Sequence, residues 1–229
     1  MLPDHSNIYL EKAQQYELLI SKQPGLAHVI GEIKKFDGLD VVDLGAGTGR
    51  LAATLAPRAK SIVALDASRA MLDIAARKLA QTGLTSWRTE AADHRKLPLE
   101  RHSADLVVSG WSLCYLTNTN VPEWERNLNE IIGEIKRVLR PGGTVVILET
   151  LGTGTDAPDA PDFLRGYYSA LTNVYGFSHK WIRTDYEFEH IGQAVELAEF
   201  FFGAELAERV KANHWVRLPE CAGIWWLHL

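Results

Sequence analysis

The sequence has few cysteines, and their spacing is not that of a metal site. Only Cys114 and Cys221 occur among the 229 residues. Two cysteines so far apart exclude both a disulfide framework and the paired spacing of structural zinc sites. We therefore expect a fold that depends on its hydrophobic core, with no metal.

Long apolar runs are also missing. No stretch approaches the roughly 18 consecutive apolar residues that a membrane-spanning helix needs. The first residues, Met1 to His5, lack the basic segment followed by an apolar segment that marks a signal peptide. These absences predict a soluble, cytoplasmic protein without a membrane partner.

Positive charge is sparse and scattered. The formal net charge is −5, and the longest basic runs are pairs such as Lys34-Lys35. Tight binding of nucleic acid needs clustered Lys and Arg on phosphates, so we expect no nucleic-acid partner. The 46% hydrophobic and 23% charged content is ordinary for a globular protein, and the length fits one domain.

Strand-like and helix-like segments alternate over the first three-fifths of the chain. The expected strands are 39–44, 61–66, 87–91, 105–109 and 144–151, and the expected helices are 50–55, 68–82 and 124–139. Ser68 is the expected N-cap of the helix over 68–82. Pro141-Gly142-Gly143 is expected to end the helix over 124–139. Strands that are apolar on both faces predict a mostly parallel sheet with helices on each side.

The last third of the chain has a different pattern. We expect a loop over 152–161, helices over 163–174, 191–202 and 205–212, and strands over 181–188 and 222–229. Without repeats or low-complexity tracts, residues 1–229 are expected to form one domain. Its predicted parts are an N-terminal helical cap (1–37), a core of alternating strands and helices (38–151) and a region with the C-terminal strands (152–229).

A glycine-rich segment joins the first expected strand to the first helix after it. Gly45, Gly47 and Gly49 alternate with single residues and follow Asp43. Glycine tolerates positive φ and lets a ligand approach the backbone. The dinucleotide fingerprint is Gly-x-Gly-x-x-Gly, with a pyrophosphate at the helix start. The one-residue spacing and the anionic Asp43 favour a ligand with an ammonium group, hence an amino-acid end.

The segment Asp43-Leu44-Gly45-Ala46-Gly47-Thr48-Gly49 resembles the first motif of class I S-adenosylmethionine (SAM)-dependent methyltransferases. The resemblance continues, in the same order over 38–151, through Asp66, Ala92-Asp93, 105–115 and Arg140-Pro141-Gly142-Gly143. It implies an α/β, Rossmann-like, seven-stranded and mostly parallel sheet with helices on both faces. The last strand would lie antiparallel between the fifth and sixth. It also implies an enzyme that methylates a small-molecule acceptor and releases S-adenosylhomocysteine (SAH).

The resemblance assigns cofactor roles position by position. Gly45, Ala46 and Gly47 would lie under the methionine part of SAM, and Asp43 would orient that loop near the ammonium group. Asp66 would accept hydrogen bonds from both ribose hydroxyls, since a carboxylate has two acceptor oxygens. The other interpretation of Asp66 is a helix N-cap, but Ser68 already serves there. The remaining expected cofactor neighbours are Ala67, Met71, Ala92, Asp93, His94, Ser109, Gly110 and Trp111.

Two of these neighbours have specific expected contacts. Asp93 would accept from the adenine amino group between Ala92 and His94, although aspartate is also common in turns for its own backbone hydrogen bonds. Ser109-Gly110-Trp111 follows the fourth strand and would line the methionine part and the transfer site. Ligands of open parallel sheets bind at that edge.

Methyl transfer requires mainly that a nucleophile is aligned with the methyl–sulfur bond of SAM. A general base is needed only where the nucleophile must lose a proton, and no catalytic triad is visible. The candidate bases or substrate ligands are His94, Tyr115, His179, Arg183 and Asp185. Alternation would place Trp181, Arg183 and Asp185 on one strand face, where an ordinary ion pair is an equally good interpretation.

Several aromatic residues have both a packing and a binding interpretation. Tyr9 and Tyr16 share a stripe with Ala13 and Ile20 on one expected N-terminal helix, where packing is favoured over cofactor contact. Trp111 and Tyr115 are the best candidates for a cation–π contact with the sulfonium. The remaining aromatics are expected in substrate-covering helices or in the core: Tyr167, Tyr168, Tyr175, Trp225 and Trp226.

Two other classes of protein stay open on the sequence. An NAD(P)-dependent oxidoreductase shares the strand–glycine–helix arrangement, but the glycine spacing disfavours it. A SAM-binding protein without catalytic activity would carry the same motifs. Ser109-Gly110-Trp111-Ser112 stands where a DNA amino-methyltransferase carries an Asn-Pro-Pro-Tyr-like motif. The motifs concern the methyl donor, so the acceptor atom (O, N, S or C) and the oligomeric state stay open.

Overall fold

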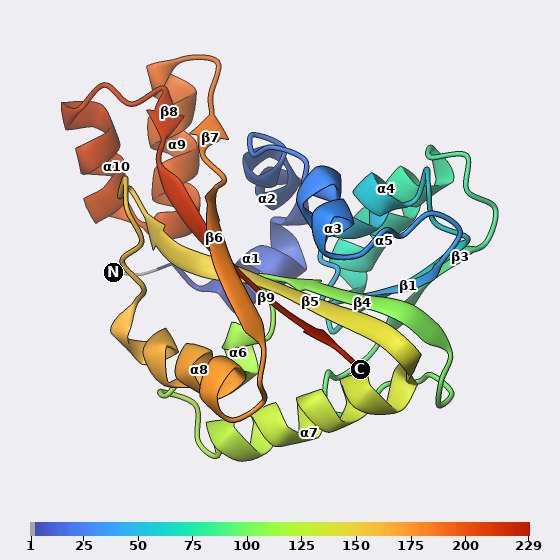
Figure 1. Cartoon of the computed structure of the whole chain (residues 1–229). Helices are drawn as coiled ribbons and strands as arrows, with labels where there is room; N and C mark the ends of the chain where they lie inside the picture. The colour runs from blue at the N-terminus through green and yellow to red at the C-terminus, as the bar shows by residue number, and fades with distance from the viewer. Residues whose placement is uncertain (1–2) are drawn as a thin grey trace.

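A seven-stranded sheet forms the centre of the molecule in a computed structural model that describes residues 3–229 (Figure 1). Residues 1 and 2 of the expected cap lie outside this described part. The strand order is β3-β2-β1-β4-β5-β9-β6. The strands are β1 (Asp40–Leu44), β2 (Ser61–Asp66), β3 (Trp87–Ala91), β4 (Ala104–Gly110), β5 (Leu139–Thr153), β6 (Ser178–Arg183) and β9 (Glu220–His228).

Only β9 runs against the other strands of this sheet. Its pairings with both β5 and β6 are antiparallel, whereas β1 to β5 pair in parallel. The expected antiparallel last strand between the fifth and sixth is therefore confirmed. Parallel neighbours bring the carboxyl ends of their strands to one edge of the sheet, which is where ligands bind in open α/β folds.

Helices cover both faces of the sheet (Figure 1). The helices are α1 (His5–Glu11), α2 (Ala13–Ile20), α3 (Ala27–Ile33), α4 (Arg50–Leu55), α5 (Arg69–Ala80), α6 (Cys114–Thr117), α7 (Trp124–Val138), α8 (Asp162–Asn173), α9 (Ile191–Phe202) and α10 (Ala204–Ala212). One core cluster joins α7 and α8 to the sheet, and a second joins α3 and α4 to the opposite face. Among residues 3–229, no helix is long and apolar enough to span a membrane.

Side-chain alternation along β1 shows how the sequence makes these two layers. Val42 and Leu44 pack into the α7–α8 cluster, whereas Val41 packs into the α3–α4 cluster. Successive side chains of a strand point to opposite faces, so an apolar run with helices on both sides buries all of them. Each such side chain contributes about 1.5–3 kcal/mol when fully buried.

A smaller unit stands beyond the carboxyl edge of the sheet. Strands β7 (Tyr186–Glu187) and β8 (Arg217–Leu218) pair there and share a core cluster with α9, α10 and Leu19. The expected continuous strand over 181–188 is therefore wrong, because β6 ends at Arg183. Asp185 is held outside the main sheet, where it accepts hydrogen bonds from Arg183, Arg217 and the backbone N–H of Glu220.

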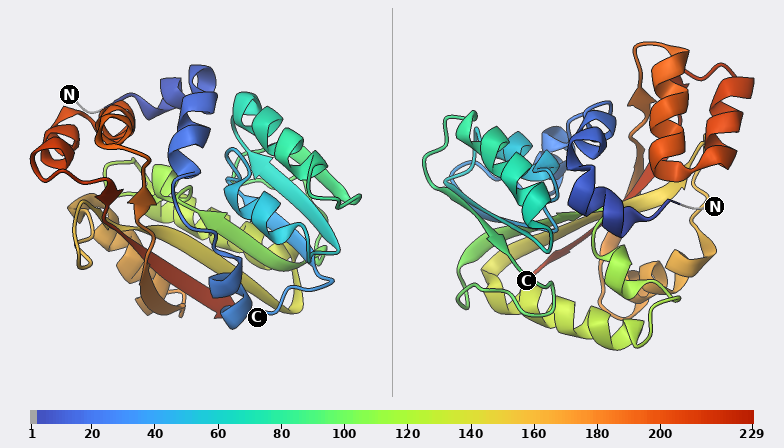
Figure 2. Two further views of the ribbon diagram at one scale, coloured as in Figure 1. Left: turned by 90° about the horizontal axis from the view of Figure 1, so that it is seen from above. Right: turned by 180° about the vertical axis from the view of Figure 1, so that it is seen from behind.

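The N-terminal cap also differs from its expected form. The prediction that one helix carries both Tyr9 and Tyr16 is wrong, since the chain bends at Lys12 and forms α1 and α2. A third helix, α3, completes the cap. Figure 2 shows α2 between α5 on one side and the α9–α10 pair on the other, and α2 contacts both α5 and α9. The cap thus joins the sheet region to the smaller unit.

Candidate cofactor and methyl-transfer site

The glycine loop leaves β1 at the carboxyl edge of the sheet. The backbone N–H groups of Gly45 and Ala46 both donate to the carbonyl of Leu65 at 2.8 Å, which fixes the loop against the end of β2. Gly45 has φ +75° and Gly47 has φ +54°, conformations that side-chain-bearing residues rarely adopt. The alternating glycines therefore serve backbone geometry, as their spacing predicted.

Asp43 lies under this loop and is almost completely buried. Its Oδ2 accepts a hydrogen bond from the backbone N–H of Ala52 at 2.8 Å, which ties the loop to α4. Among the described residues, Oδ1 has no hydrogen-bond partner. Burial raises the pKa of this carboxyl to about 7. A cation placed near the loop would favour the ionised form of Asp43.

Asp66 connects the glycine loop to the start of α5. Its Oδ2 accepts from the backbone N–H of Gly47 at 2.9 Å, and its Oδ1 accepts from that of Ser68 at 2.8 Å. The Ser68 hydroxyl, in turn, accepts from the N–H of Met71, so Ser68 is the N-cap of α5 as expected. A carboxylate has about four acceptor positions, so Asp66 keeps one position free on each oxygen.

The loop after β3 folds back over the glycine loop. His94 Nε2 is 2.8 Å from Ser112 Oγ, and a Cβ added to Gly45 would lie 1.7 Å from that same Oγ. Burial lowers the pKa of His94, whose Nδ1 has no partner within residues 3–229. Asp93 accepts two hydrogen bonds from the Arg95 guanidinium, which lowers its pKa to about 2. Asp93 is therefore ionised at neutral pH.

Residues at the end of β4 complete this edge. The buried Ser109 donates its hydroxyl to the carbonyl of Leu44 at 2.7 Å, which locks β4 to β1. Trp111 has φ +51°, and the Arg50 guanidinium stacks 4.3 Å from its ring centroid. Ala46 packs into the core beneath, and Ala92 donates its N–H to the carbonyl of Asp66.

An aromatic group from the cap covers the same edge. Tyr9 and Tyr115 share a hydroxyl–hydroxyl hydrogen bond, and Tyr16 packs edge-on against Tyr9. Tyr9 and Tyr16 also pack against Met71, as the packing interpretation expects. His5 stacks on Phe201 of α9 at 4.4 Å, which links this aromatic group to the smaller unit. Burial raises the pKa of Tyr9, Tyr16 and Tyr115, so all three are neutral hydroxyls.

The other candidate residues lie on β6 or directly after it. His179 stands on β6, separated from β4 by β9 and β5, and stacks on Trp225 at 4.5 Å. Arg183 makes two hydrogen bonds to Asp185, so the ion pair that the sequence left open is present. The expected shared strand face for Trp181, Arg183 and Asp185 is wrong, because Asp185 follows the end of β6.

The remaining aromatic candidates belong to the core. Tyr167 and Tyr168 of α8 are buried against the sheet, and Tyr168 stacks on Trp225 at 4.5 Å. Tyr175 packs against the edge of this cluster. Trp225 is buried on the α7–α8 face, and Trp226 packs partly buried on the opposite face. The Trp pair thus contributes to both layers.

Sequence reasoning missed two buried glutamates beside this edge. Glu149 near the end of β5 accepts from the N–H of Cys114, and burial raises its pKa to about 7. Glu220 at the start of β9 accepts from the Thr150 hydroxyl at 2.9 Å, and burial raises its pKa to about 7 as well. A carboxylate inside the otherwise apolar run 144–151 was the available signal for Glu149.

Glu149→Gln is expected to change how stability depends on pH. The pKa of Glu149 rises from 4.5 to about 7 on folding. As pH rises from 4.5 through 7, the unfolded state loses the proton of Glu149 while the folded state keeps it. The free energy of unfolding therefore falls by about 3 kcal/mol over that range. Urea unfolding of both proteins at pH 5 and pH 7.5 measures this. Glutamine should gain stability relative to wild type at the higher pH, and a difference independent of pH would contradict the assignment.

Known proteins resemble this chain in sequence and in fold. Residues 42–147 match the family described as Methyltransferase domain. The demethylmenaquinone methyltransferase of Lactiplantibacillus plantarum is 31% identical over 70% of this chain and 67% of its own length. That of Clavibacter sepedonicus is 32% identical over 72% of this chain and 58% of its own length. With a site built from these motifs, the chain belongs to the class I SAM-dependent methyltransferases.

A solved structure shows the same architecture. The SAM-dependent methyltransferase of Aquifex aeolicus superposes with a TM-score of 0.55, covering 99% of this chain and 94% of that one. At 16% identity this likeness concerns the fold. The chain spans about half the length of the curated relatives it matches, with 52% and 58% in two of them. Family membership thus establishes the methyl donor used by the group.

Proposed function

We propose that this protein transfers a methyl group from SAM to a small-molecule acceptor. The observation that carries the proposal is Asp66, whose carboxylate is fixed by two backbone N–H groups and keeps one acceptor position on each oxygen. A vicinal diol, such as that of a ribose, fits two adjacent acceptors. The buried Asp43, whose Oδ1 has no partner among the described residues, puts negative charge under the glycine loop and so favours an ammonium group near it.

The residues present fit SAM as the bound group. Gly45, Ala46 and Gly47 would support its methionine part, together with Ser109, Gly110 and Trp111 from β4. Asp66, Ala67 and Met71 would hold the ribose, and Ala92, Asp93 and His94 would surround the adenine. When bound, SAM supplies an electrophilic methyl group on a cationic sulfur. The protein then needs to orient the acceptor and exclude water, for which proximity contributes up to roughly 7–11 kcal/mol.

His94 and Tyr115 are the candidates for proton handling at the transfer site. Both lie at the carboxyl edge, and the lowered pKa of His94 keeps its imidazole neutral and able to accept a proton. His179, Arg183 and Asp185 are a weaker set, since β5 and β9 separate β6, which carries His179 and Arg183, from β4, and Asp185 follows the end of β6. We assign them to acceptor recognition at most.

A small acceptor fits both the charge and the architecture. The net charge of −5 disfavours a nucleic-acid substrate. Relatives carry names such as demethylmenaquinone methyltransferase and malonyl-[acyl-carrier protein] O-methyltransferase. We propose that residues 1–229 work as one domain in the cytoplasm, with 38–151 holding SAM and with 1–37 and 152–229 enclosing the acceptor.

Isothermal titration with SAH, SAM and NADH tests the donor. We expect SAH and SAM to bind and NADH not to bind, because Asp43 opposes a pyrophosphate. Transfer of labelled methyl from SAM across a panel of quinols, carboxylic acids and amines then tests the reaction. Binding of NADH alone would replace the proposal with an oxidoreductase, and SAM binding without turnover across all classes would favour a binding protein.

SAH affinity is expected to rise with pH between 5.5 and about 7.5. Asp43 has a pKa of about 7 in the free protein, and an ammonium group nearby binds its ionised form more tightly. Protonation at low pH therefore opposes binding, and binding near pH 6.5 should release a proton. Titrations in buffers of different ionisation enthalpy measure that proton. Asp43→Asn should flatten the pH dependence, and an unchanged profile in this variant would contradict the role of Asp43.

A further inference from the structure

Arg50, the first residue of α4, has an unsatisfied and buried N–H group. Its Nη1 donates to Gln23 Oε1 at 2.8 Å, and its guanidinium stacks on Trp111. The Nη2 atom is buried and has no hydrogen-bond partner among residues 3–229. A buried polar group without a partner costs about 1–3 kcal/mol, and more when it is charged. The stability of the fold alone therefore does not account for an unpartnered Nη2 at this position.

No carboxylate of the described residues forms an ion pair with Arg50. Glu17, which faces the same space, pairs with Lys78 at 2.6 Å. Glu220 acts on Arg50 from a distance: its Oε1 accepts from Thr150, and its buried Oε2 has no hydrogen-bond partner among the described residues. By contrast, Arg183 and Arg137 each pair with a carboxylate. Because an arginine keeps its charge in proteins, Arg50 is a cation without a direct ion-pair partner among the described residues, and Glu220 and Glu17 act on it only from a distance.

The guanidinium of Arg50 is held in a fixed position from two sides. Gln23 donates its Nε2 to the carbonyl of Thr184 at 2.6 Å, which turns its Oε1 toward Arg50. Trp111 supports one face of the guanidinium plane. A pre-oriented donor binds an acceptor with little further loss of conformational entropy. These contacts hold the guanidinium, and with it Nη2, in one orientation.

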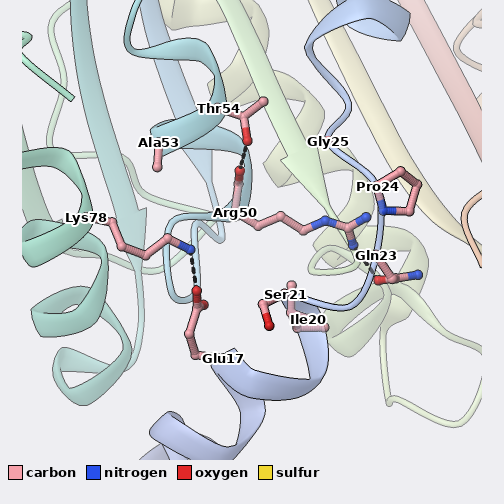
Figure 3. A pocket seen from close by; sticks show the side chains of 10 residues that line it. All are labelled: Glu17, Ile20, Ser21, Gln23, Pro24, Gly25, Arg50, Ala53, Thr54 and Lys78. Atoms are coloured by element: carbon pink, nitrogen blue, oxygen red, sulfur yellow. Dashed lines mark hydrogen bonds and ion pairs between the residues drawn. The ribbon is translucent and has the colours of Figure 1, made fainter. Parts of the chain in front are cut away.

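A cavity of about 260 Å³ lies beside this group, between α2 and α4. Figure 3 shows Arg50 extended across it toward Gln23 and Pro24, with the Lys78–Glu17 ion pair on the opposite wall. Two cations and one carboxylate line the cavity, so a single negative charge would balance it. A monoanion thus suits the site better than a doubly charged phosphate does.

We propose that Arg50 binds a carboxylate group of a ligand through Nη2. This inference rests on the proposed function and extends it. Such a carboxylate can come from two sources: the amino-acid end of SAM or the methyl acceptor. Charge-assisted hydrogen bonds to arginine are about twice as strong as neutral ones. Arg50 would therefore set either the cofactor affinity or the acceptor specificity.

Arg50→Met tests the proposal, because methionine keeps an apolar stem against Trp111 and removes the charge. The probes are SAH and its analogue without the carboxylate, S-adenosyl-3-thiopropylamine. If the cofactor is the source, the variant should bind SAH about tenfold to a hundredfold more weakly and the analogue with unchanged affinity. If the acceptor is the source, SAH affinity should stay unchanged, while the thermal stabilisation of SAH-saturated protein by propionate or benzoate disappears.

The matched control is Arg58→Met. Arg58 also stacks on an aromatic ring, that of Phe36 at 4.5 Å, but it is exposed and pairs with Asp37. This variant should bind every probe as wild type does. Arg50→Lys keeps the charge without the planar fork and covers the case in which Arg50→Met does not fold; it should lose affinity for the same probe. If the Arg50 variants bind SAH, propionate and benzoate as tightly as the wild-type protein does, the proposal is overturned. If the wild-type protein itself does not bind SAH, the proposed function is refuted.

Discussion

Asp66→Ala is expected to weaken SAH binding by between about a hundredfold and ten-thousandfold. Each hydrogen bond from a ribose hydroxyl to a charged acceptor contributes about 1.5–3 kcal/mol, and alanine removes both. The carboxylate lies between the glycine loop and α5, where it accepts from Gly47 and Ser68. Isothermal titration of SAH measures the loss directly.

Part of this loss is structural, and a control separates it. Without Asp66, the N–H groups of Gly47 and Ser68 lose their acceptor, so the melting temperature should also fall. Asp40→Ala is the matched variant, because Asp40 accepts from the Ser61 hydroxyl and pairs with Lys60 at the amino end of β1. It should lower stability without weakening SAH binding. Equal SAH affinity of Asp66→Ala and wild type would remove Asp66 from the cofactor site.

The sequence predicts the first half of the sheet well because its signals there are local. The ranges expected for β2, β3 and α4 agree with the structure, that for β1 differs by one residue at its start, and that for β4 by one residue at each end. Short apolar runs between glycines or charges define these strands without knowledge of their neighbours. The position of β9 came from the family resemblance, since nothing in its own residues states which strands it pairs with.

The misplaced elements depend on contacts between distant segments. Alternation over 181–188 favours a strand, but Asp185 is bound by Arg217 and by the backbone of Glu220, which take the chain away from the sheet. The expected N-terminal helix likewise breaks at Lys12, where α1 packs against α5 and α2 reaches α9. Tertiary packing overrides local periodicity at both places.

The candidate site divides in the same way. Asp43, Asp66 and the glycines could be found because their roles attach to a contiguous motif and to strand ends. Arg50 carries no such signal, since its partners Gln23 and Trp111 come from two distant segments of the chain. The choice between a ribose ligand and an N-cap at Asp66 turned on Ser68, whose hydroxyl occupies the cap position.

Gly45→Ala is expected to have the largest combined effect on stability and binding. The added Cβ would lie 1.7 Å from Ser112 Oγ and 2.3 Å from Ser112 Cβ, so the loop after β4 must move. Overpacking of this kind costs about 1–3 kcal/mol. The positive φ of Gly45 adds about 1–2 kcal/mol for an alanine. Chemical denaturation should show the sum, and SAH binding should be lost because the displaced loop carries Trp111.

Two further variants separate the strain from the collision. Gly38→Ala introduces alanine at φ +70° with no atom within 4 Å of the new Cβ, so it should lose only the 1–2 kcal/mol of backbone strain. Ser112→Gly added to Gly45→Ala removes both clashing atoms and should bring the loss down to that same level. If the double variant stays as unstable as Gly45→Ala, Ser112 does not lie over the glycine loop. If Gly45→Ala binds SAH normally, the loop is not the support of the methionine part, because a methyl group there would obstruct a ligand lying on the backbone.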